Sequence, residues 1–346
     1  MTILHVIDSL GKGGSETLLM SYIPKLSKYN HIIVTFSKPN EFEEITKNHT
    51  FYCLHIQNKL GLIKGVYLLR RIIYNKKVSI VHAHSYWSNI LSRLATPSNL
   101  KVINHYHFAD YDTMARKLSV RLMVLMENLL RRKNLVRVAV SAYVEKILRK
   151  KFPASIIKLL PNFADCREIE DVKRNIVPTK LRLNIIVVGS LKSEKNYSLL
   201  IKAFAMLQHL PVFVDIYGGG DKLEYYRRTS AHLPNVTFKG NSNNVAGILK
   251  DYDLYCSTSS SETFGIALLE AVCAGLPALV SDIDAFKEVA PAGTVFFRNN
   301  DAEDFAQKLA SLYETGIVVS EEAYRKVLKH FSKDIFLGEL QKIYNS

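Results

Sequence analysis

The pattern of hydrophobic and polar positions predicts alternating strands and helices along the first half of the chain. Short apolar runs are typical of strands buried in a parallel sheet, and apolar residues spaced three or four positions apart are typical of helices. The expected strands are Ile3–Ile7, His31–Phe36, Ser79–Ala83, Lys101–His105 and Val136–Val140. The expected helices are Glu16–Leu26, Leu62–Asn75, Trp87–Ala95, Ala115–Arg132 and Val144–Phe152.

The second half of the chain repeats this alternation. Its expected strands are Leu183–Val188, Val212–Tyr217, Val236–Lys239, Asp253–Ser257 and Pro277–Ser281. Its expected helices are Tyr197–Leu207, Lys222–Leu233, Val245–Lys250, Phe264–Ala274 and Ala302–Tyr313. Strand–helix alternation in both halves predicts an α/β protein with two doubly wound parallel sheets.

The length and the interruption of the pattern predict two domains. A chain of 346 residues exceeds what one hydrophobic core usually supports. The alternation stops at residues 166–181, a charged stretch containing Pro178 that we interpret as a linker. It separates a first domain, residues 1–165, from a second domain, residues 182–330, and residues 331–346 form a final helix. Ligands of open parallel sheets bind beyond the carboxyl ends of the strands, so a central cleft between two such domains is the expected active site.

The excess of basic over acidic residues is confined to the first half of the chain. The formal net charge is +14; residues 1–178 contain 28 Lys and Arg against 13 Asp and Glu, and residues 179–346 contain 18 against 19. One-sided positive charge attracts anionic membranes, phosphorylated acceptors or nucleic acid, and a merely soluble basic face is the alternative. The segment from Ala115 to Lys133 carries leucines between basic ends, so it is either a helix on an anionic membrane or a buried amphipathic helix.

Several classes of protein are disfavoured by composition. No apolar run approaches the roughly 20 residues that span a bilayer, and the first residues lack the features of a signal peptide. The cysteines have no paired spacing, so we expect neither disulfides nor a structural zinc site, and a reducing compartment. We therefore expect a cytoplasmic protein, with peripheral attachment to the inner membrane face as an option. No DNA- or RNA-binding motif is present, so we expect no nucleic-acid partner. The four cysteines are Cys53, Cys166, Cys256 and Cys273.

Two glutamates eight positions apart, Glu262 and Glu270, mark the most informative segment of the chain. Gly265 lies between them, where a helix is expected to begin. The first turn of a helix has unpaired amides that suit a phosphate, and carboxylates accept hydrogen bonds from sugar hydroxyls. The segment therefore predicts a sugar-nucleotide site, although an acidic residue near a helix start also occurs simply because it offsets the helix dipole. Glu270 lies on an apolar helix face, where a carboxylate is costly unless a partner such as a ribose diol donates to it.

Three further loops follow expected strands. Gly13 and Gly14 lie in a glycine-rich turn, which either lets the backbone approach a ligand or is only a turn. Lys195 stands just before a helix, in a loop that either binds a diphosphate or caps the helix. Two His-x-His pairs, His82/His84 and His105/His107, lie at the ends of the third and fourth expected strands. We expect His107, at the end of the second pair, to contact a substrate. We expect no metal at these pairs, because no acidic or cysteine partner lies nearby at metal-site spacing.

Together these motifs resemble the family-four retaining glycosyltransferases, which have the GT-B fold of two Rossmann-like domains facing a central cleft. The resemblance spans nearly the whole chain in the same order. Its most specific part is the pair Glu262 and Glu270 with Phe264-Gly265 between them, followed by Ala-x-x-Ala-Gly-x-Pro. The family's Gly-Gly-x-Glu loop, domain-end serine helix and Pro-Asn-Gly-x-Asp turn are similar to residues 13–16, 141–144 and 161–165.

The resemblance implies transfer of a sugar, with retention of configuration, from a UDP- or GDP-linked nucleotide sugar to a hydroxyl of a saccharide or lipid-linked acceptor. Surface polysaccharide or glycolipid synthesis is the implied setting, and no cofactor is required. Glu262 and His107 would contact the donor sugar, Lys195 would hold the diphosphate, and Glu270 would bind the ribose. The final helix would return to the first domain, which would take the acceptor. The further substrate-binding residues would be Gly13, Gly14, Ser190, Phe264, Gly265 and Ile266.

Two positions depart from the family pattern. Ser190 stands where the family commonly has a phosphate-binding arginine, and Phe163 replaces the glycine of the Pro-Asn-Gly turn. Loss of a charge-assisted bond to phosphate weakens donor binding unless Lys192 compensates. A GT-B nucleotide-sugar epimerase or phosphorylase is the alternative function, and a nucleic-acid-binding protein is a less favoured one. No Gly-x-Gly-x-x-Gly follows a strand, which argues against a dehydrogenase.

Overall fold

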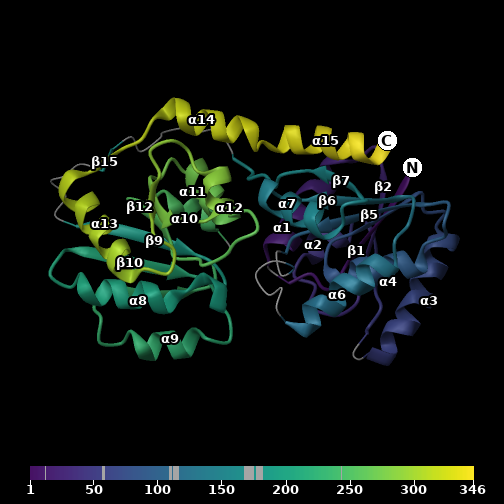
Figure 1. The fold of residues 1–346 in the computed structure, drawn as a ribbon, viewed down its shortest axis with the longest axis horizontal. Helices are drawn as coiled ribbons and strands as arrows, with labels where there is room; N and C mark the ends of the chain where they lie inside the picture. The colour runs from purple at the N-terminus through teal and green to yellow at the C-terminus, as the bar shows by residue number, and fades with distance from the viewer. Residues whose placement is uncertain are drawn as a thin grey trace. The chain divides into compact units, whose positions relative to one another are not determined.

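The computed structural model describes all residues from 1 to 346 except 12, 57–58, 109–110, 112–116, 167–174, 177–181 and 243. The chain divides into two compact units. The first contains residues Met1–Asn162 together with Lys333–Ser346, and the second contains residues Phe163–Ser332. Most of the expected linker, residues 166–181, lies outside the described residues. Each unit is built around its own parallel sheet (Figure 1).

The first unit has a seven-stranded parallel sheet in the order β3-β2-β1-β4-β5-β6-β7. Its strands are β1 (Thr2–Ile7), β2 (Asn30–Thr35), β3 (Thr50–Cys53), β4 (Ile80–Ala83), β5 (Lys101–Tyr106), β6 (Leu135–Ala139) and β7 (Ile156–Leu159). Its helices are α1 (Gly14–Tyr22), α2 (Glu43–Thr46), α3 (Lys59–Asn75), α4 (Tyr86–Ala95), α6 (Leu118–Leu129), α7 (Ala142–Lys151) and α15 (Lys333–Asn345), with a short 3-10 turn η1 (Ile23–Lys25).

The second unit has a six-stranded parallel sheet in the order β11-β10-β9-β12-β13-β14. Its strands are β9 (Leu183–Val188), β10 (Val212–Tyr217), β11 (Val236–Gly240), β12 (Leu254–Ser257), β13 (Ala278–Ser281) and β14 (Val295–Phe297). Its helical elements are η2 (Ser193–Lys195), α8 (Tyr197–Met206), α9 (Leu223–Thr229), α10 (Val245–Leu249), α11 (Ile266–Cys273), α12 (Asp284–Val289), α13 (Ala302–Thr315) and α14 (Glu321–His330). The short strands β8 (Asn175–Ile176) and β15 (Ile317–Val318) pair antiparallel.

The two doubly wound parallel sheets predicted from the sequence are confirmed. In each sheet the chain order reverses beside the first strand of that sheet, β1 or β9. These central strands are apolar at consecutive positions because helices cover both faces of the sheet. Ile185 and Ile186 of β9, which point to opposite faces, are both fully buried. The carboxyl ends of the central strands are therefore where the topology places a ligand site in each unit.

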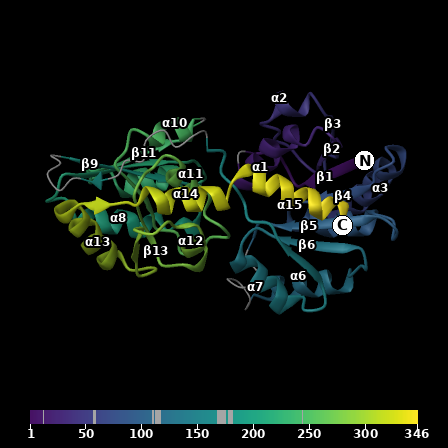
Figure 2. The same cartoon turned by 90° about the horizontal axis from the view of Figure 1, so that it is seen from above.

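The C-terminal helix α15 packs on the first unit. Tyr344 on α15 has its hydroxyl 2.9 Å from Nδ1 of His82 on β4, and Phe336 packs against Tyr22 on α1. The ammonium of Lys101 on β5 donates to the carbonyl of Ile343. Figure 2 shows α15 lying over the strands of this sheet. The last residues of the chain thus complete the core that the first residues begin.

A buried polar network holds α6 against the sheet. Glu127 on α6 is fully buried and forms an ion pair with Arg93 on α4, and Arg137 on β6 approaches the same carboxylate oxygen at 3.3 Å. Tyr106 and Tyr111 donate to Glu127 at 2.8 and 3.1 Å. A buried carboxylate needs this many donors, since removing it from water without them is costly. One glutamate therefore fixes the position of the whole helix.

Several elements differ from the sequence prediction. The structure adds α2, β3, β7, β8, α12, β14, β15 and α14, which are short or carry polar residues on much of their surface. The helix expected at Lys222–Leu233 runs from Leu223 to Thr229, because beyond it the helical i→i−4 bonds give way to turns, in which the amides of Ala231 and Leu233 donate to carbonyls three residues earlier. The helix expected at Ala115–Arg132 is described from Leu118 to Leu129.

The expectation that no disulfide forms was wrong. Cys166 and Cys273 are joined by a disulfide across 107 positions of sequence, and their Cα atoms are 5.4 Å apart. This separation lies within the usual range for a disulfide. Sequence spacing could not predict it, because the fold brings the start of the second unit beside the end of α11. Cys53 and Cys256 are free thiols.

We predict that Glu127→Gln lowers the free energy of unfolding by about 3–5 kcal/mol, since it leaves Arg93 and Arg137 buried without a counter-ion. Equilibrium urea unfolding of the variant and of the unaltered protein measures the effect. Glu339→Gln, which removes only an exposed partner of Lys342 on α15, is the matched control and should change stability little. Equal effects of the two substitutions would show that the network does not anchor α6.

Candidate active site

The start of α11 is an uncapped helix end at the carboxyl edge of the second sheet. Gly265 is its N-cap, with φ +96, and no side chain caps it. A Cβ on Gly265 would lie 2.9 Å from Phe286, so both the backbone conformation and the space require glycine here. The unpaired amides of Ile266 and its neighbours carry partial positive charge and suit an anion.

Glu262 and Lys195 form an ion pair just before this helix start. The Glu262 carboxylate also accepts a hydrogen bond from Ser259 at 2.9 Å. The side chains of Lys195 and Glu262 are 20% and 16% exposed, so solvent and ligands can reach both. The sequence predicts both residues as site residues, and the structure shows in addition that each is the partner of the other. Until an anion binds, Lys195 is therefore neutralised by Glu262.

Two loops are tied together to make this pair. The loop containing Lys195 follows β9 and the loop containing Glu262 follows β12, and these strands are neighbours in the sheet. Ser260 donates its amide to the carbonyl of Glu194 at 2.8 Å, and the Thr258 hydroxyl donates to the carbonyl of Lys195 at 3.0 Å. The loops are thus positioned by hydrogen bonds to main-chain carbonyls and not only by the ion pair.

Glycines let a third loop approach the first. A Cβ on Gly218, after β10, would lie 1.9 Å from the carbonyl oxygen of Gly189, after β9. Ser190, which stands in place of the family's arginine, is exposed, and its carbonyl accepts the amide of Lys192 at 2.8 Å. Phe264 is buried against Phe331, so only its backbone is available to a ligand.

Glu270 lies one turn inside α11 and is partly buried. Burial raises the pKa of Glu270 to about 7. Among the residues that the structure describes, none donates a hydrogen bond to its carboxylate. A carboxylate in this position gains free energy when a ligand supplies hydroxyl donors. The pKa of buried Tyr255 is raised well above its usual value by burial and by both Glu262 and Glu270, which places the two glutamates around one region.

The site residues of the first unit lie at the carboxyl edge of its own sheet. Gly13 is the N-cap of α1, and a Cβ there would meet the carboxylate of Glu16 at 2.3 Å; Gly14 is the first, exposed residue of the helix. His107 follows β5 and is half-buried, with its Nε2 buried and without a partner among the described residues. Burial lowers the pKa of His107 to about 4, so the ring is neutral at neutral pH.

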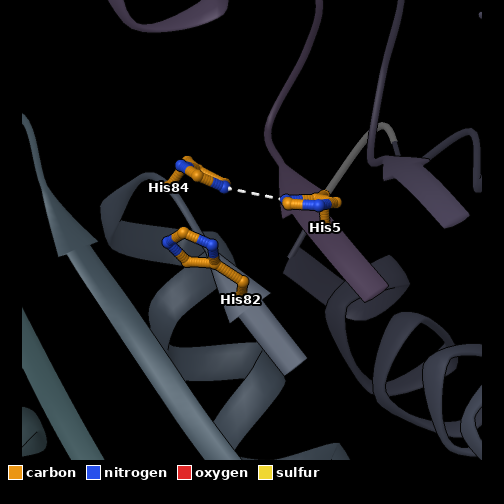
Figure 3. A group of neighbouring side chains, drawn as sticks. All are labelled: His5, His82 and His84. Atoms are coloured by element: carbon orange, nitrogen blue, oxygen red, sulfur yellow. Dashed lines mark hydrogen bonds between the residues drawn. The ribbon is translucent and has the colours of Figure 1, made fainter. Parts of the chain in front are cut away.

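His107 belongs to a larger group of buried histidines. His5 on β1 and His31 on β2 join the two His-x-His pairs on one face of the sheet, and Figure 3 shows His5, His82 and His84. Two sets, His5/His82/His84 and His84/His105/His107, each have nitrogen atoms within 4.8 Å of one another. Sequence reasoning missed His5 and His31, because each is a lone histidine in an apolar strand and only the sheet register brings them to the others.

The chain thus has two doubly wound parallel sheets, each with a ligand site at the carboxyl ends of its central strands, where the strand order reverses. This is the architecture of the GT-B glycosyltransferase fold. A crystal structure of HepE from Anabaena in complex with UDP and glucose matches with a TM-score of 0.80 over 99% of both chains, at 14% identity. The family model described as glycosyltransferase family 4 matches residues 12–168, and the model described as glycosyl transferases group 1 matches residues 168–330. The chain therefore belongs to the group 1 and family 4 glycosyltransferases and is a glycosyltransferase.

Curated relatives agree with this assignment. EpsF of Bacillus subtilis (strain 168), which carries the name of a glycosyltransferase, is 26% identical over 85% of this chain and 82% of its own length. The phosphatidyl-myo-inositol mannosyltransferase of Mycobacterium leprae (strain TN) is 22% identical over 80% of this chain and 76% of its own length. The family resemblance predicted from the motifs is confirmed, whereas the roles of the individual site residues stay predictions.

We predict that Glu270 makes the stability of the protein fall as pH rises. Its pKa is about 7 in the folded protein against 4.5 in a free side chain, so the folded state holds the proton more tightly across that window. Thermal unfolding of the unaltered protein and of Glu270→Gln between pH 4.5 and 8 measures this effect. The difference in melting temperature between the variant and the unaltered protein should grow in favour of the variant as pH rises to about 7, and should then stay constant. If the two plots of melting temperature against pH are parallel, the pKa of Glu270 is not raised in the folded protein.

Proposed function

We propose that this enzyme moves a sugar from a nucleoside diphosphate sugar, UDP- or GDP-linked, to a hydroxyl of a saccharide or lipid-linked acceptor, with retention of configuration. The observation that carries the proposal is the Lys195–Glu262 pair at the uncapped start of α11. It combines an ammonium and helix amides, which suit a diphosphate, with a carboxylate that suits sugar hydroxyls. Synthesis of a surface polysaccharide or glycolipid is the setting that this chemistry fits.

Donor binding would exchange the partners of Lys195. An arriving diphosphate competes with Glu262 for the ammonium, because it carries more negative charge and also bonds the first amides of α11. The released Glu262 carboxylate then accepts hydrogen bonds from the donor sugar. Glu270, which has no donor among the described residues, would accept from the ribose hydroxyls. The site thereby couples recognition of the sugar to recognition of the phosphates.

The chemical step would depend on positive charge held in place before the reaction. Negative charge grows on the diphosphate as the bond to the sugar breaks, and fixed donors at that place lower the barrier without reorganising. The departing phosphate oxygen would take the proton of the acceptor hydroxyl. Since the acceptor then attacks from the face that the diphosphate leaves, the sugar keeps its configuration. His107 and the glycine turn at Gly13 and Gly14 would contact the donor from the first unit.

The comparisons support this choice of ligands. HepE, which has the same fold, is described in complex with UDP and glucose. The mannosyltransferase relative is named for a phosphatidyl-inositol acceptor. A nucleotide sugar and a lipid-linked acceptor are therefore the first substrates to test on this chain.

We predict that Lys195→Ala and Glu262→Ala each lower sugar transfer at least ~100-fold, the effect of losing one pre-organised charged group. The donor is chosen by a thermal-shift screen of UDP and GDP sugars, and transfer is measured by product analysis. Lys202→Ala, which removes an exposed lysine from α8, is the matched control and should leave transfer unchanged. Near-normal turnover in both site variants contradicts the proposal. Conversion of the donor in the absence of any acceptor would instead favour an epimerase.

We further propose that the first unit works at an anionic membrane on its cytoplasmic side, through α6. Only Val120 and Glu127 of this helix are buried. Leu118 and Leu129, at its two ends, are 69% and 74% exposed, and the residues between them continue one apolar stripe at helical spacing. The exposed apolar residues of α6 are Leu118, Leu122, Leu125, Met126 and Leu129.

The charges around this stripe are those that anionic lipids attract. The only acidic residue of α6, Glu127, is buried in the arginine network, so the helix presents no negative charge. Lys117, Arg121, Arg131 and Lys133 are exposed along it. An exposed apolar stripe between basic residues is typical of a helix that lies in a membrane interface. No helix among the described residues is long and apolar enough to cross a membrane, so attachment through α6 would be peripheral.

A basic pocket at the end of α6 supports the same reading of this surface. It has a volume of about 330 Å³, and its lining contains no acidic residue. Arg137 is held at its base by the Ser155 hydroxyl at 2.7 Å, and Arg131 reaches the carbonyl of Ala154. Ile156 on β7 is half exposed beside it. A phosphate of an anionic lipid suits such a pocket. The charged residues lining it are Arg131, Arg132, Lys133 and Arg137.

We predict that Leu122→Gln combined with Leu125→Gln lowers binding to vesicles containing an anionic phospholipid at least ~10-fold, because it removes two exposed leucines that would insert into the membrane. Co-sedimentation at low salt measures binding. Met206→Gln, an exposed apolar position of the second unit, is the control. Binding should also weaken as salt rises. Peripheral attachment through α6 is contradicted if the double variant binds the vesicles as well as the control does. It is also contradicted if the unaltered protein does not bind them.

A further inference from the structure

Six histidines lie together on one face of the first sheet. They are buried there, and buried polar groups need hydrogen-bond partners. Four neighbouring strands supply them: β2, β1, β4 and β5, with two of the six directly after β4 and β5. Five are nearly inaccessible to solvent, with at most 3% exposed, and the sixth is half-buried. Burial lowers the pKa of every one, so all are neutral imidazoles. The six are His5, His31, His82, His84, His105 and His107.

Hydrogen bonds fix the proton positions in half of this cluster. Nε2 of His31 lies 3.0 Å from the carbonyl of Leu26, which can only accept, so this nitrogen carries the proton. Nδ1 of His31 then accepts from Nε2 of His5 at 3.0 Å. Nδ1 of His5 in turn accepts from Nε2 of His84 at 3.4 Å. The chain of bonds leaves His84 with a free lone pair on Nδ1, and Figure 3 shows this second nitrogen on the side away from His5.

The other two histidines on that side have unused nitrogens. Both ring nitrogens of His105 are buried without a partner among the described residues, and so is Nε2 of His107. Ring centroids of His105 and His107 are 4.3 Å apart, and that of His84 lies 5.7 and 5.9 Å from them. Orphaned buried nitrogens cost about 1–3 kcal/mol each. In a neutral imidazole one ring nitrogen has a free lone pair, so a species that accepts lone pairs would satisfy one nitrogen of each ring.

We propose that His84, His105 and His107 bind a divalent transition-metal ion of the zinc type. One nitrogen from each lies within 4.8 Å of the others. Three nitrogens around tetrahedral zinc lie roughly 3.3 Å apart, given bonds of about 2.05 Å, so small side-chain rotations would close the set. Neutral imidazole suits zinc, nickel and copper, whereas calcium and magnesium need oxygen ligands.

The bond chain through His5 and His31 supports such a site. A metal-binding histidine usually donates its other N–H to a partner that fixes the ring and its tautomer. His84 has this arrangement, ending at the carbonyl of Leu26. A fourth protein ligand is absent among the described residues, so the ion would keep an open position on the side of half-buried His107. The metal site goes beyond the proposed transfer reaction. Because His107 is also proposed to contact the donor, the test of the metal site counts bound metal and does not use activity.

The alternative set His5, His82 and His84 is less suited to a metal ion. Nε2 of His82 is buried without a partner among the described residues, and Nδ1 lies 2.9 Å from the Tyr344 hydroxyl, but both nitrogens of His5 are engaged in the bond chain. A metal there would have to break the bond chain that orients His84. The two sets share His84, so variants of the residues that differ between them can distinguish the two positions.

Metal binding is tested on the full chain with any affinity tag removed. The protein is stripped with a chelator and incubated with Zn²⁺, and bound zinc is counted by mass spectrometry after desalting. Cobalt substitution reports the ligand geometry through its visible absorption. We expect about one zinc ion per chain and a thermal stability that rises with the zinc concentration. The cobalt-substituted protein should have the visible absorption of a four-coordinate site with three nitrogen ligands and one open position.

Four variants locate the ion. His105→Phe and half-buried His107→Asn should each abolish stoichiometric binding, and the second keeps the test valid if the first does not fold. His82→Phe should retain the ion, and His5→Phe should weaken affinity about 10–100-fold, because His5 is the hydrogen-bond partner that orients His84. No zinc in the unaltered protein, unchanged binding in both ligand variants, or loss in His82→Phe with retention in the ligand variants would each overturn the proposal.

Discussion

The ion pair between Lys195 and Glu262 is the interaction on which the site of the second unit depends. It joins the loops that follow two neighbouring strands, and hydrogen bonds from the Ser260 amide and the Thr258 hydroxyl to main-chain carbonyls hold these loops together. Because both side chains are accessible, the pair can exchange for ligand contacts. The helix start at Gly265 lies directly after it, has no side-chain cap among the described residues, and adds partial positive charge. The fold thus keeps two opposite charges ready for two parts of one substrate.

The same constraint, that a buried polar group needs a partner, organises the first unit. Glu127 satisfies two arginines and two tyrosines, and by doing so it turns the apolar face of α6 outward. The histidine cluster meets the constraint only in part, since His105 and His107 keep free nitrogens among the described residues. The Glu127 network has all its hydrogen-bond partners within the protein. We propose that a metal ion supplies the missing partners of the histidine cluster, and that a membrane covers the exposed apolar face of α6.

Local patterns in the sequence were enough to predict the fold but not the pairings within it. The strand at Leu183–Val188 was predicted to the residue, because it is apolar at every position except Asn184, as is typical of a buried parallel strand. Lys195 and Glu262 were both found from their loops, yet 67 positions separate them and nothing local shows that they pair. Cys166 and Cys273 were missed for the same reason at a separation of 107. Sheet register, and not periodicity, decides such contacts.

The exchange of partners at Lys195 is the central claim, and calorimetric binding of a nucleoside diphosphate that carries no sugar tests it most directly. The comparison is between the unaltered protein, Lys195→Ala and Glu262→Ala, with UDP and GDP. Without a sugar, Glu262 only competes with the diphosphate for the ammonium. Glu262→Ala should therefore bind the nucleotide at least as tightly as the unaltered protein, while Lys195→Ala binds it at least ~10-fold more weakly. Equal weakening by both substitutions would contradict the account.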